Sequence, residues 1–432
     1  MQRFLMADLL EWKDSPHRKP LVLNGARQVG KTWLLQELGK TAFKNVAYVS
    51  FDNNPQLASL FDNGYDLAQI LLGIQAESRQ KITQEETLII FDEIQECPKA
   101  LTSLKYFYEQ MPGQAIAAAG SLLGITIHEG TGYPVGKVTT LDLYPLSFRE
   151  FLDATNESAL RELVDSGDWK LIDSFKEKLT SLLRQYYFIG GMPEVVSRFA
   201  ESANLSEARQ IQKDILQGYE RDIFKHLSRT EAEYTLAAWN SLPAQLSKEN
   251  KKYIFGHIKS GARAKNYHAA ITWLTKSGLV LKVPRVTKPG VPLSAYTNSA
   301  FKLFALDVGL LGAMSGLDER SILEGNLLFT EFKGAFAEQF VCQQLIAECG
   351  LTTFYWSAEN SRGEIDFVVQ KDGITYPVEV KAEENLKSKS LRAFCEKYKG
   401  MQARRFSLSG YRDEGWMQNI PLYAIAPFAN WK

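Results

Sequence analysis

Eight consecutive residues near the N-terminus have the types and spacing of a phosphate-binding loop, the pattern GxxxxGK[ST]. They are Gly25, Ala26, Arg27, Gln28, Val29, Gly30, Lys31 and Thr32. Glycines let backbone N–H groups curl around phosphate oxygens, and the helix that such a loop opens adds its positive end. Lys31 is placed to reach the β- and γ-phosphates, and Thr32 to bind Mg²⁺. The run therefore predicts a site for ATP and Mg²⁺, with Lys31 also in a catalytic role.

An acidic pair follows a second apolar run and complements this loop. Leu88–Phe91 has the apolar composition of a buried strand, and Asp92 and Glu93 follow it directly. Asp92 is expected to hold Mg²⁺ through water, and Glu93 to polarise the attacking water as a general base. A glutamate beside the metal aspartate favours hydrolysis over nucleotide binding alone.

A third strand end supplies a weaker candidate. Ile116–Ala119 is followed by Gly120 and Ser121. In sheets of this kind such a strand lies between the two motifs, so Ser121 is a candidate to hydrogen-bond the γ-phosphate or the water. An ordinary turn explains the same serine equally well.

The elements that must position these residues alternate between strand and helix. Helical periodicity at Trp33–Leu38 and Leu101–Tyr108 separates apolar runs. The alternation predicts an α/β fold with a parallel sheet and flanking helices. The predicted strands are 21–24, 46–51, 88–91, 116–119 and 138–141.

The rest of the chain changes pattern twice. Residues 148–233 are helical and rich in charge. Predicted helices at 246–258 and 264–276 are followed by strands at 279–283 and 291–296, which is the order of a winged helix. The last hundred residues predict helices at 333–348 and 391–398, with strands at 352–355, 364–369 and 375–380.

Length and composition limit the possible classes of protein. A chain of 432 residues predicts two to four domains. The charges of fifty basic and fifty acidic residues cancel. The net charge therefore gives no reason to expect a polyanionic partner. Four scattered cysteines fit a reducing compartment. Because no apolar run reaches the roughly 18–20 residues that span a bilayer, we expect a cytoplasmic protein without a membrane partner.

Several motifs resemble those of the prokaryotic AAA-type P-loop ATPases that carry a C-terminal domain of unknown function. Besides the loop and the acidic pair, the resemblance rests on the runs 143–148, 190–193, 221–223, 304–310 and 334–340. It implies four parts: an ATPase core (1–147), a helical lid (148–235), a winged helix with a connector (236–330) and a C-terminal α/β domain similar to restriction endonucleases (331–432). The substrate is not implied.

The same resemblance implies a further arginine at the ATP site. AAA-type ATPases usually complete the site with an arginine from the lid or from a neighbouring subunit, and the second case would make the protein a homo-oligomer. Arg184 and Arg221 are the candidates, although a structural ion pair explains either one at least as well.

A C-terminal hairpin carries a second group of chemical interest. With Asp372-Gly373 as a two-residue turn, Lys371 pairs with Ile374, and Asp366 lies opposite Glu379. Opposed carboxylates repel, and a divalent cation removes the repulsion. Asp366, Glu379 and Lys381 match the constellation of metal-dependent nucleases of the PD-(D/E)xK type. By resemblance, Glu338 supplies a further ligand. A nuclease fold used only for binding, or a solvated hairpin with cross-strand ion pairs, remains open.

The predicted winged helix is strongly basic. Ten basic residues and one acidic residue lie between residues 245 and 290, about +9 in charge. A winged helix places its second helix in the DNA major groove, so Arg263, Lys265 and Asn266 would begin the recognition helix and Lys288 the wing. Packing between domains is the alternative role.

Two functional hypotheses follow. The first is a Mg²⁺-dependent ATP hydrolase that associates with DNA through the basic segment and carries a nuclease-like domain that cuts it. The second is a nucleotide-dependent switch or scaffold that binds protein partners through a catalytically dead nuclease fold.

Overall fold

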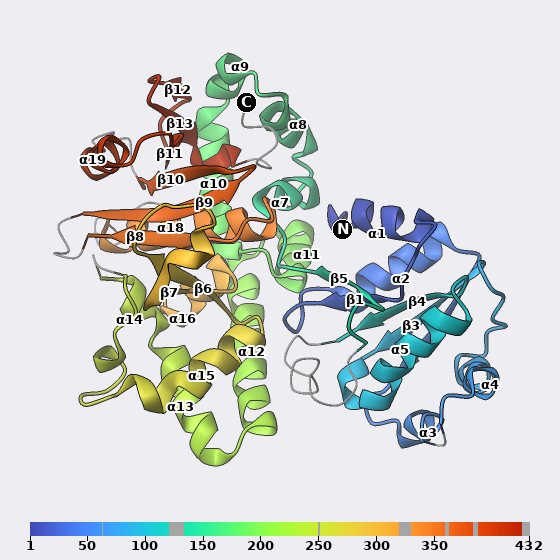
Figure 1. The fold of residues 1–432 in the computed structure, drawn as a ribbon. Helices are drawn as coiled ribbons and strands as arrows, with labels where there is room; N and C mark the ends of the chain where they lie inside the picture. Colours follow the sequence, from blue (N-terminus) through green and yellow to red (C-terminus); the bar gives the residue numbers. More distant parts are fainter. Residues whose placement is uncertain are drawn as a thin grey trace. The chain divides into compact units, whose positions relative to one another are not determined.

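The chain folds into two compact units in this computed structural model (Figure 1). Residues 2–144 form the first unit, and residues 145–275 and 279–432 form the second. The structure describes residues 1–62, 64–120, 134–248, 251–318, 330–358, 363–382 and 388–425.

Five parallel strands form the centre of the first unit, in the order β2-β3-β4-β1-β5. They are β1 (Leu21–Asn24), β2 (Asn45–Ser50), β3 (Thr87–Asp92), β4 (Ala115–Ala119) and β5 (Thr139–Asp142). Each begins within one residue of its predicted position, because β1 to β4 are centred on short apolar runs and Val138 leads directly into β5. The prediction of an α/β fold with a parallel sheet is confirmed, and β4 does lie between β1 and β3.

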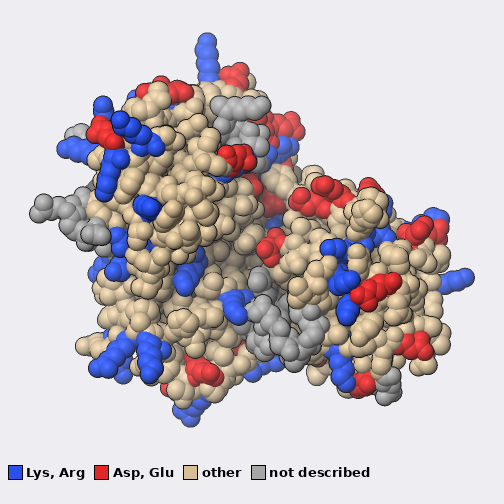
Figure 2. Space-filling view, in the orientation of Figure 1, with Lys and Arg blue, Asp and Glu red and all other residues tan. Residues whose placement is uncertain are grey.

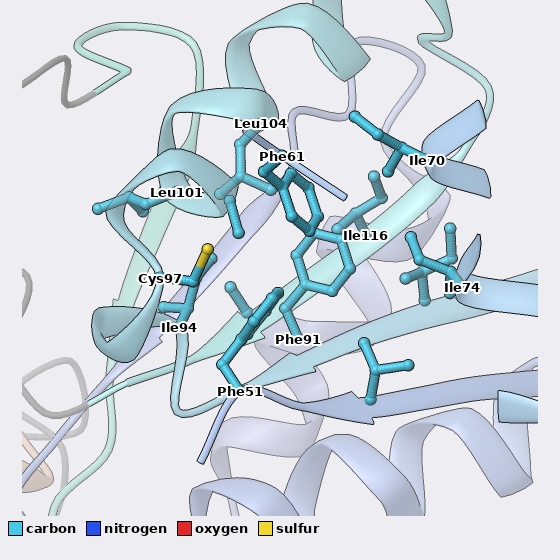
Figure 3. Packing of buried hydrophobic residues seen from close by; sticks show 14 of the residues in the cluster. Phe51, Phe61, Ile70, Ile74, Phe91, Ile94, Cys97, Leu101, Leu104 and Ile116 are labelled. Atoms are coloured by element: carbon cyan, nitrogen blue, oxygen red, sulfur yellow. The ribbon is translucent and has the colours of Figure 1, made fainter. Parts of the chain in front are cut away.

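Helices cover this sheet. They are α1 (Leu5–Asp14), α2 (Lys31–Ala42), α3 (Pro55–Ser59), α4 (Leu67–Ser78), the 3₁₀ turn η1 (Ile94–Glu96) and α5 (Pro98–Gln110). Residues of α3, α4 and α5 pack on alternate residues of β2, β3 and β4, around Phe51, Phe61 and Phe91 (Figure 3). These three rings meet edge to face, with centroids 5.6–6.1 Å apart. Helix α2 contacts the same strands, and Figure 1 shows it on the side of the sheet away from α5.

The second unit begins with helices and ends with a mixed sheet. Its first helices are α7 (Phe148–Ala154), α8 (Ser158–Ser166), α9 (Trp169–Ser174), α10 (Lys176–Ile189), α11 (Pro193–Ser202), α12 (Leu205–His226), α13 (Arg229–Asn240) and α14 (Leu242–Leu246). Then come η2 (Phe255–His257), α15 (Ala264–Lys276), β6 (Val280–Val286), η3 (Leu293–Tyr296), β7 (Thr297–Ala305), α16 (Val308–Met314) and α18 (Thr330–Ala347). The last elements are β8 (Phe354–Ser357), β9 (Glu364–Lys371), β10 (Ile374–Val380), α19 (Lys389–Lys397), β11 (Ala403–Ser407), β12 (Arg412–Asp413), β13 (Met417–Pro421) and η5 (Leu422–Ala424).

Strands from two predicted domains share one sheet. Eight strands follow the order β12-β13-β11-β10-β9-β8-β6-β7. The antiparallel pair β6 and β7, in the region where the sequence predicted a wing, joins the sheet through the parallel pairing of β6 with β8. The predicted domain boundaries at 235/236 and 330/331 stay predictions. The boundary at 330/331 separates β6 and β7 from the other strands of the same sheet.

Two predicted elements are wrong. The helix predicted over 246–258 is interrupted, because the Gln245 side-chain amide bonds both backbone groups of Ile254 (2.8 and 3.1 Å). The strand predicted over 291–296 is the turn η3, and β7 begins only at Thr297.

The hairpin register is confirmed. Ile374 pairs with Lys371, and the ladder continues to Val378 opposite Phe367. Asp372 and Gly373 form the turn with positive φ angles of 51° and 77°, as a type I′ hairpin requires.

Buried hydrogen bonds join three of the motifs on which the family resemblance rests. The Gly191 N–H donates to Asp307 (2.6 Å), and the Leu146 N–H donates to the Gly191 carbonyl (2.7 Å). From α18, the Gln343 amide donates to Asp307 (3.2 Å) and to the hydroxyl of Tyr186 (3.0 Å). These motifs therefore have a structural role in the second unit.

No helix within the described ranges is both long enough and apolar enough to cross a membrane.

Candidate functional site

The predicted phosphate loop connects β1 to α2. Gly30 caps α2 with φ 93°, a conformation that favours glycine. Gly25 has no room for a side chain, since a Cβ there would collide with the Leu143 carbonyl oxygen just beyond β5. Val29 is buried, and its carbonyl accepts a hydrogen bond from Arg3 (3.1 Å). The loop backbone is thus fixed by its neighbours on both sides.

Lys31 lies folded onto its own loop. Its ammonium donates to the carbonyls of Gly25 (3.0 Å) and Ala26 (2.8 Å). Burial lowers the pKa of Lys31 to about 8, an effect that the nearby carboxylates of Glu93 and Asp92 oppose. An ammonium satisfied only by carbonyls is well placed to exchange them for phosphate oxygens.

The predicted metal residues of this unit meet. The Thr32 hydroxyl lies 3.1 and 3.0 Å from the two Asp92 carboxylate oxygens, across the ends of α2 and β3. Asp92 is 7% exposed. A hydroxyl and a buried carboxylate at this distance are suitable donors for Mg²⁺ bound to a nucleotide.

Sequence reasoning missed Tyr48 on β2. Its hydroxyl donates to the second Asp92 oxygen at 2.8 Å. Burial, and then the Asp92 carboxylate, raise the pKa of Tyr48, so the phenol keeps its proton and remains a donor. No sequence motif marks Tyr48, because tyrosine is common in strands. The one signal that could have identified it is its position near the carboxyl end of β2, the strand next to β3.

Glu93 follows Asp92 in an unusual backbone conformation, with φ 49°. Its N–H donates to Asp92 (3.1 Å), and its carboxylate accepts a hydrogen bond from the Gln95 side chain. The Glu93 carboxylate is half-buried, and its charge opposes the lowering of the Lys31 pKa by burial.

The remaining candidates of the ATP site are placed as follows. Arg27 is half-buried and Gln28 exposed, with φ 66° at Gln28. Ser121 lies outside the described residues. Arg184 on α10 and Arg221 on α12 are both exposed in the second unit, and their role stays a prediction.

In the second unit, the predicted metal ligand Glu338 meets two lysines that sequence reasoning did not place there. Glu338 on α18 forms ion pairs with Lys251 and, at 3.5 Å, with Lys302 of β7. Lys302 also lies 2.5 Å from Glu364 of β9. Burial raises the pKa of Glu338, but the two ammonium groups outweigh it and lower the pKa overall.

Asp366 lies beside this cluster. Its carboxylate accepts a hydrogen bond from the Val380 N–H (2.8 Å) at the point where the hairpin ladder ends. Burial, followed by the charge of Glu338, raises the pKa of Asp366 to about 7, while Lys302 and Lys251 oppose the shift.

The last two candidates pair with each other. Lys381 lies 3.1 Å from one oxygen of Glu379, which is 7% exposed. The other Glu379 oxygen is buried and has no hydrogen-bond partner in the described part of the chain. The donor chemistry suits a divalent cation. However, no group of three or more His, Cys, Asp or Glu side chains is placed to hold a metal within the described ranges. This metal site stays a prediction.

Comparisons with known proteins support the prediction that the first unit resembles P-loop ATPases. Residues 17–152 match the model of the AAA domain family. Residues 180–321 and 333–424 match two domains of unknown function, DUF8612 and DUF4143. The likeness of the C-terminal part to nucleases is therefore not confirmed.

Among individual proteins, an uncharacterized protein of Mycobacterium tuberculosis is 24% identical over 376 residues, 84% of this chain and 71% of that protein. An uncharacterized protein of Haemophilus influenzae is 26% identical over 201 residues, 44% of this chain and 43% of that protein. A Walker-type ATPase structure from Pyrococcus abyssi covers 72% of this chain and 95% of its own, at 13% identity and a TM-score of 0.44. Likeness at this level supports no argument about function.

Proposed function

We propose that the first unit binds ATP with Mg²⁺ and hydrolyses it. The contact of the Thr32 hydroxyl with the Asp92 carboxylate supports this most directly, because it brings the two predicted metal residues to one point beside Lys31. Mg²⁺ would neutralise charge on the phosphates, while Glu93 accepts the proton of the attacking water.

The test is ATP hydrolysis by the full chain and two variants. Lys31→Ala should lose nucleotide binding, since it removes the ammonium for the β- and γ-phosphates. Glu93→Gln should keep binding and lose turnover, since it removes only the base. Hydrolysis by both variants at the wild-type rate would refute the assignment.

We further propose that the second unit associates with DNA through its basic segment. Figure 2 shows Lys and Arg side chains over the part of the unit where Figure 1 places α13 and α15. The exposed basic residues of the segment within this unit are Lys248, Lys252, Lys259, Arg263, Lys265, Lys282 and Lys288. Lys251 does not belong to this surface, since it is 9% exposed and paired with Glu338.

Salt-dependent DNA binding tests this proposal. Each phosphate contact adds to the slope of affinity against salt concentration. The triple variant Lys259→Ala, Arg263→Ala, Lys265→Ala should bind more weakly and with a shallower slope. The matched control replaces three exposed basic residues in or near α19, Lys389, Lys397 and Lys399, with alanine. Equal effects of the two sets would argue against a defined interface.

A second candidate function is a nucleotide-dependent switch whose C-terminal part binds partners without cutting DNA. The buried Lys302, which pairs with the predicted metal ligand Glu338, favours it over an active nuclease. Incubation of DNA with Mn²⁺ separates the two candidates. Cleavage that disappears in Asp366→Ala supports the nuclease, and absence of cleavage supports the switch.

A further inference from the structure

Lys302 lies next to the predicted metal ligand Glu338 and next to Glu364. It is fully buried, and its ammonium lies 2.5 Å from Glu364, 3.5 Å from Glu338 and 5.0 Å from the centre of the Tyr355 ring. A buried ammonium is stable only when carboxylates or ring faces compensate its charge. Lys302 therefore depends on the same oxygens that a divalent cation would use.

Lys251 brings a second ammonium from outside the sheet. It contacts the first oxygen of Glu338, whereas Lys302 faces the second. The segment that carries Lys251 is attached to β7, because the Tyr253 N–H donates to the Phe301 carbonyl (2.8 Å) and the two rings stack at 5.4 Å. Lys251 thus reaches Glu338 from a segment that lies outside the sheet and is attached to it two residues further along, at Tyr253.

These contacts leave neither oxygen of Glu338 free for a cation. Mg²⁺ binds oxygens at about 2.0–2.1 Å and needs several of them around one point. Both Glu338 oxygens face ammonium groups, and Glu364 faces Lys302. A doubly charged ion placed among them would also be repelled by two positive charges.

We propose that Lys302 and Lys251 are built-in counter-ions that take the place of a divalent cation in this cluster. Lys302 is the permanent one, because it lies within a sheet strand. Lys251 is the removable one, because it belongs to the basic segment and stands next to the exposed Lys252. While Lys251 is seated on Glu338, the C-terminal sheet stays free of metal. This inference goes beyond the proposed ATP hydrolysis and does not depend on it.

Mn²⁺ binding to the full chain tests the proposal. Asp92→Asn serves as the parent, so that the ATP site does not contribute a metal, and bound Mn²⁺ is followed by electron paramagnetic resonance. We expect the parent to bind no Mn²⁺ and the added Lys251→Met substitution to create a Mn²⁺ site. Adding Asp366→Asn to that variant should remove the site again. Lys252→Met is the matched control and should behave like the parent.

Two results would overturn the proposal. One is a parent that already binds Mn²⁺ and loses it with Asp366→Asn, since the lysines would then not exclude the metal. The other is a Lys251→Met variant that keeps the parent's circular dichroism and melting temperature but binds no Mn²⁺. Lys302→Met, measured in the same way, tests the second counter-ion separately.

Discussion

The Tyr48 hydroxyl and the Asp92 carboxylate form a 2.8 Å hydrogen bond between neighbouring strands of the first unit. Asp92 also contacts the Thr32 hydroxyl, so two hydroxyl groups fix its orientation. A carboxylate held from both sides loses little rotational freedom when it binds a metal ion, directly or through water. In the proposed ATP site, we therefore expect Tyr48 to position the carboxylate that would hold Mg²⁺.

Tyr48→Phe should raise the Mg²⁺ concentration needed for half-maximal ATP hydrolysis. Hydrogen bonds to charged groups contribute about 1.5–3 kcal/mol, so we expect a shift of roughly tenfold or more. Nucleotide affinity without Mg²⁺ should change little, which distinguishes lost positioning from general damage. Tyr65→Phe, in the same unit, is the control. An unchanged Mg²⁺ dependence in Tyr48→Phe would exclude this role.

Nucleotide binding should depend on pH through Lys31. Burial lowers the pKa of Lys31 to about 8. In the protein without nucleotide, the Lys31 amine is therefore protonated below about pH 8 and neutral above it. Phosphates favour the charged form, and binding above about pH 8 must therefore take up a proton. Affinity should fall as the pH rises through this range. Calorimetry in buffers of different ionisation enthalpy measures the uptake.

Lys31→Arg provides the control for this dependence. A guanidinium keeps its proton throughout the same pH range. The variant should bind nucleotide without proton uptake. If it shows the same pH dependence as the wild type, another group is responsible.

Asp307 should be critical for the stability of the second unit. Its carboxylate is fully buried and accepts hydrogen bonds from Gly191, Leu310 and Gln343. Asp307→Ala leaves three buried donors without their acceptor, and we expect a loss of about 3 kcal/mol or more. Asp307→Asn keeps one oxygen and should lose less. Thermal melts of both, with the exposed Asp214→Ala as control, measure the difference.

Arg3 should matter for nucleotide affinity although it lies outside every motif. Its guanidinium donates to the Val29 carbonyl of the phosphate loop (3.1 Å) and to the Tyr144 carbonyl (2.6 Å). Arg3→Met removes both bonds and should weaken ATP binding, while Arg3→Lys keeps one of them and should lose less. A binding titration with a fluorescent ATP analogue measures both. Equal affinities in all three proteins would contradict the prediction.

The sequence predicted the fold of the first unit well because local patterns determine it. Strands β1 to β4 are centred on short apolar runs, and the loop from Gly25 to Thr32 needs glycine where φ is positive or space is absent. The hairpin register followed from the turn at Asp372 and Gly373. In each case neighbouring residues along the chain carry the information.

Contacts between distant residues could not be predicted in the same way. Lys302 stands in a strand among apolar neighbours and is separated from Glu338 by 36 positions, so nothing local shows that it is buried. Tyr48 and Asp92 are 44 positions apart. The helix predicted over 246–258 failed for a related reason: the Gln245 side chain supplies backbone hydrogen bonds that periodicity does not reveal.

The shared eight-stranded sheet has a practical consequence for dissecting the protein. A fragment starting near residue 331 would lack β6 and β7, so β8 would become an open edge. It would also lose Lys251 and Lys302, leaving Glu338 and Glu364 without counter-ions in the interior. Exposed strand edges promote aggregation, and unpaired buried charges oppose folding. An excised C-terminal fragment that keeps this sheet intact would therefore have to begin before Lys251.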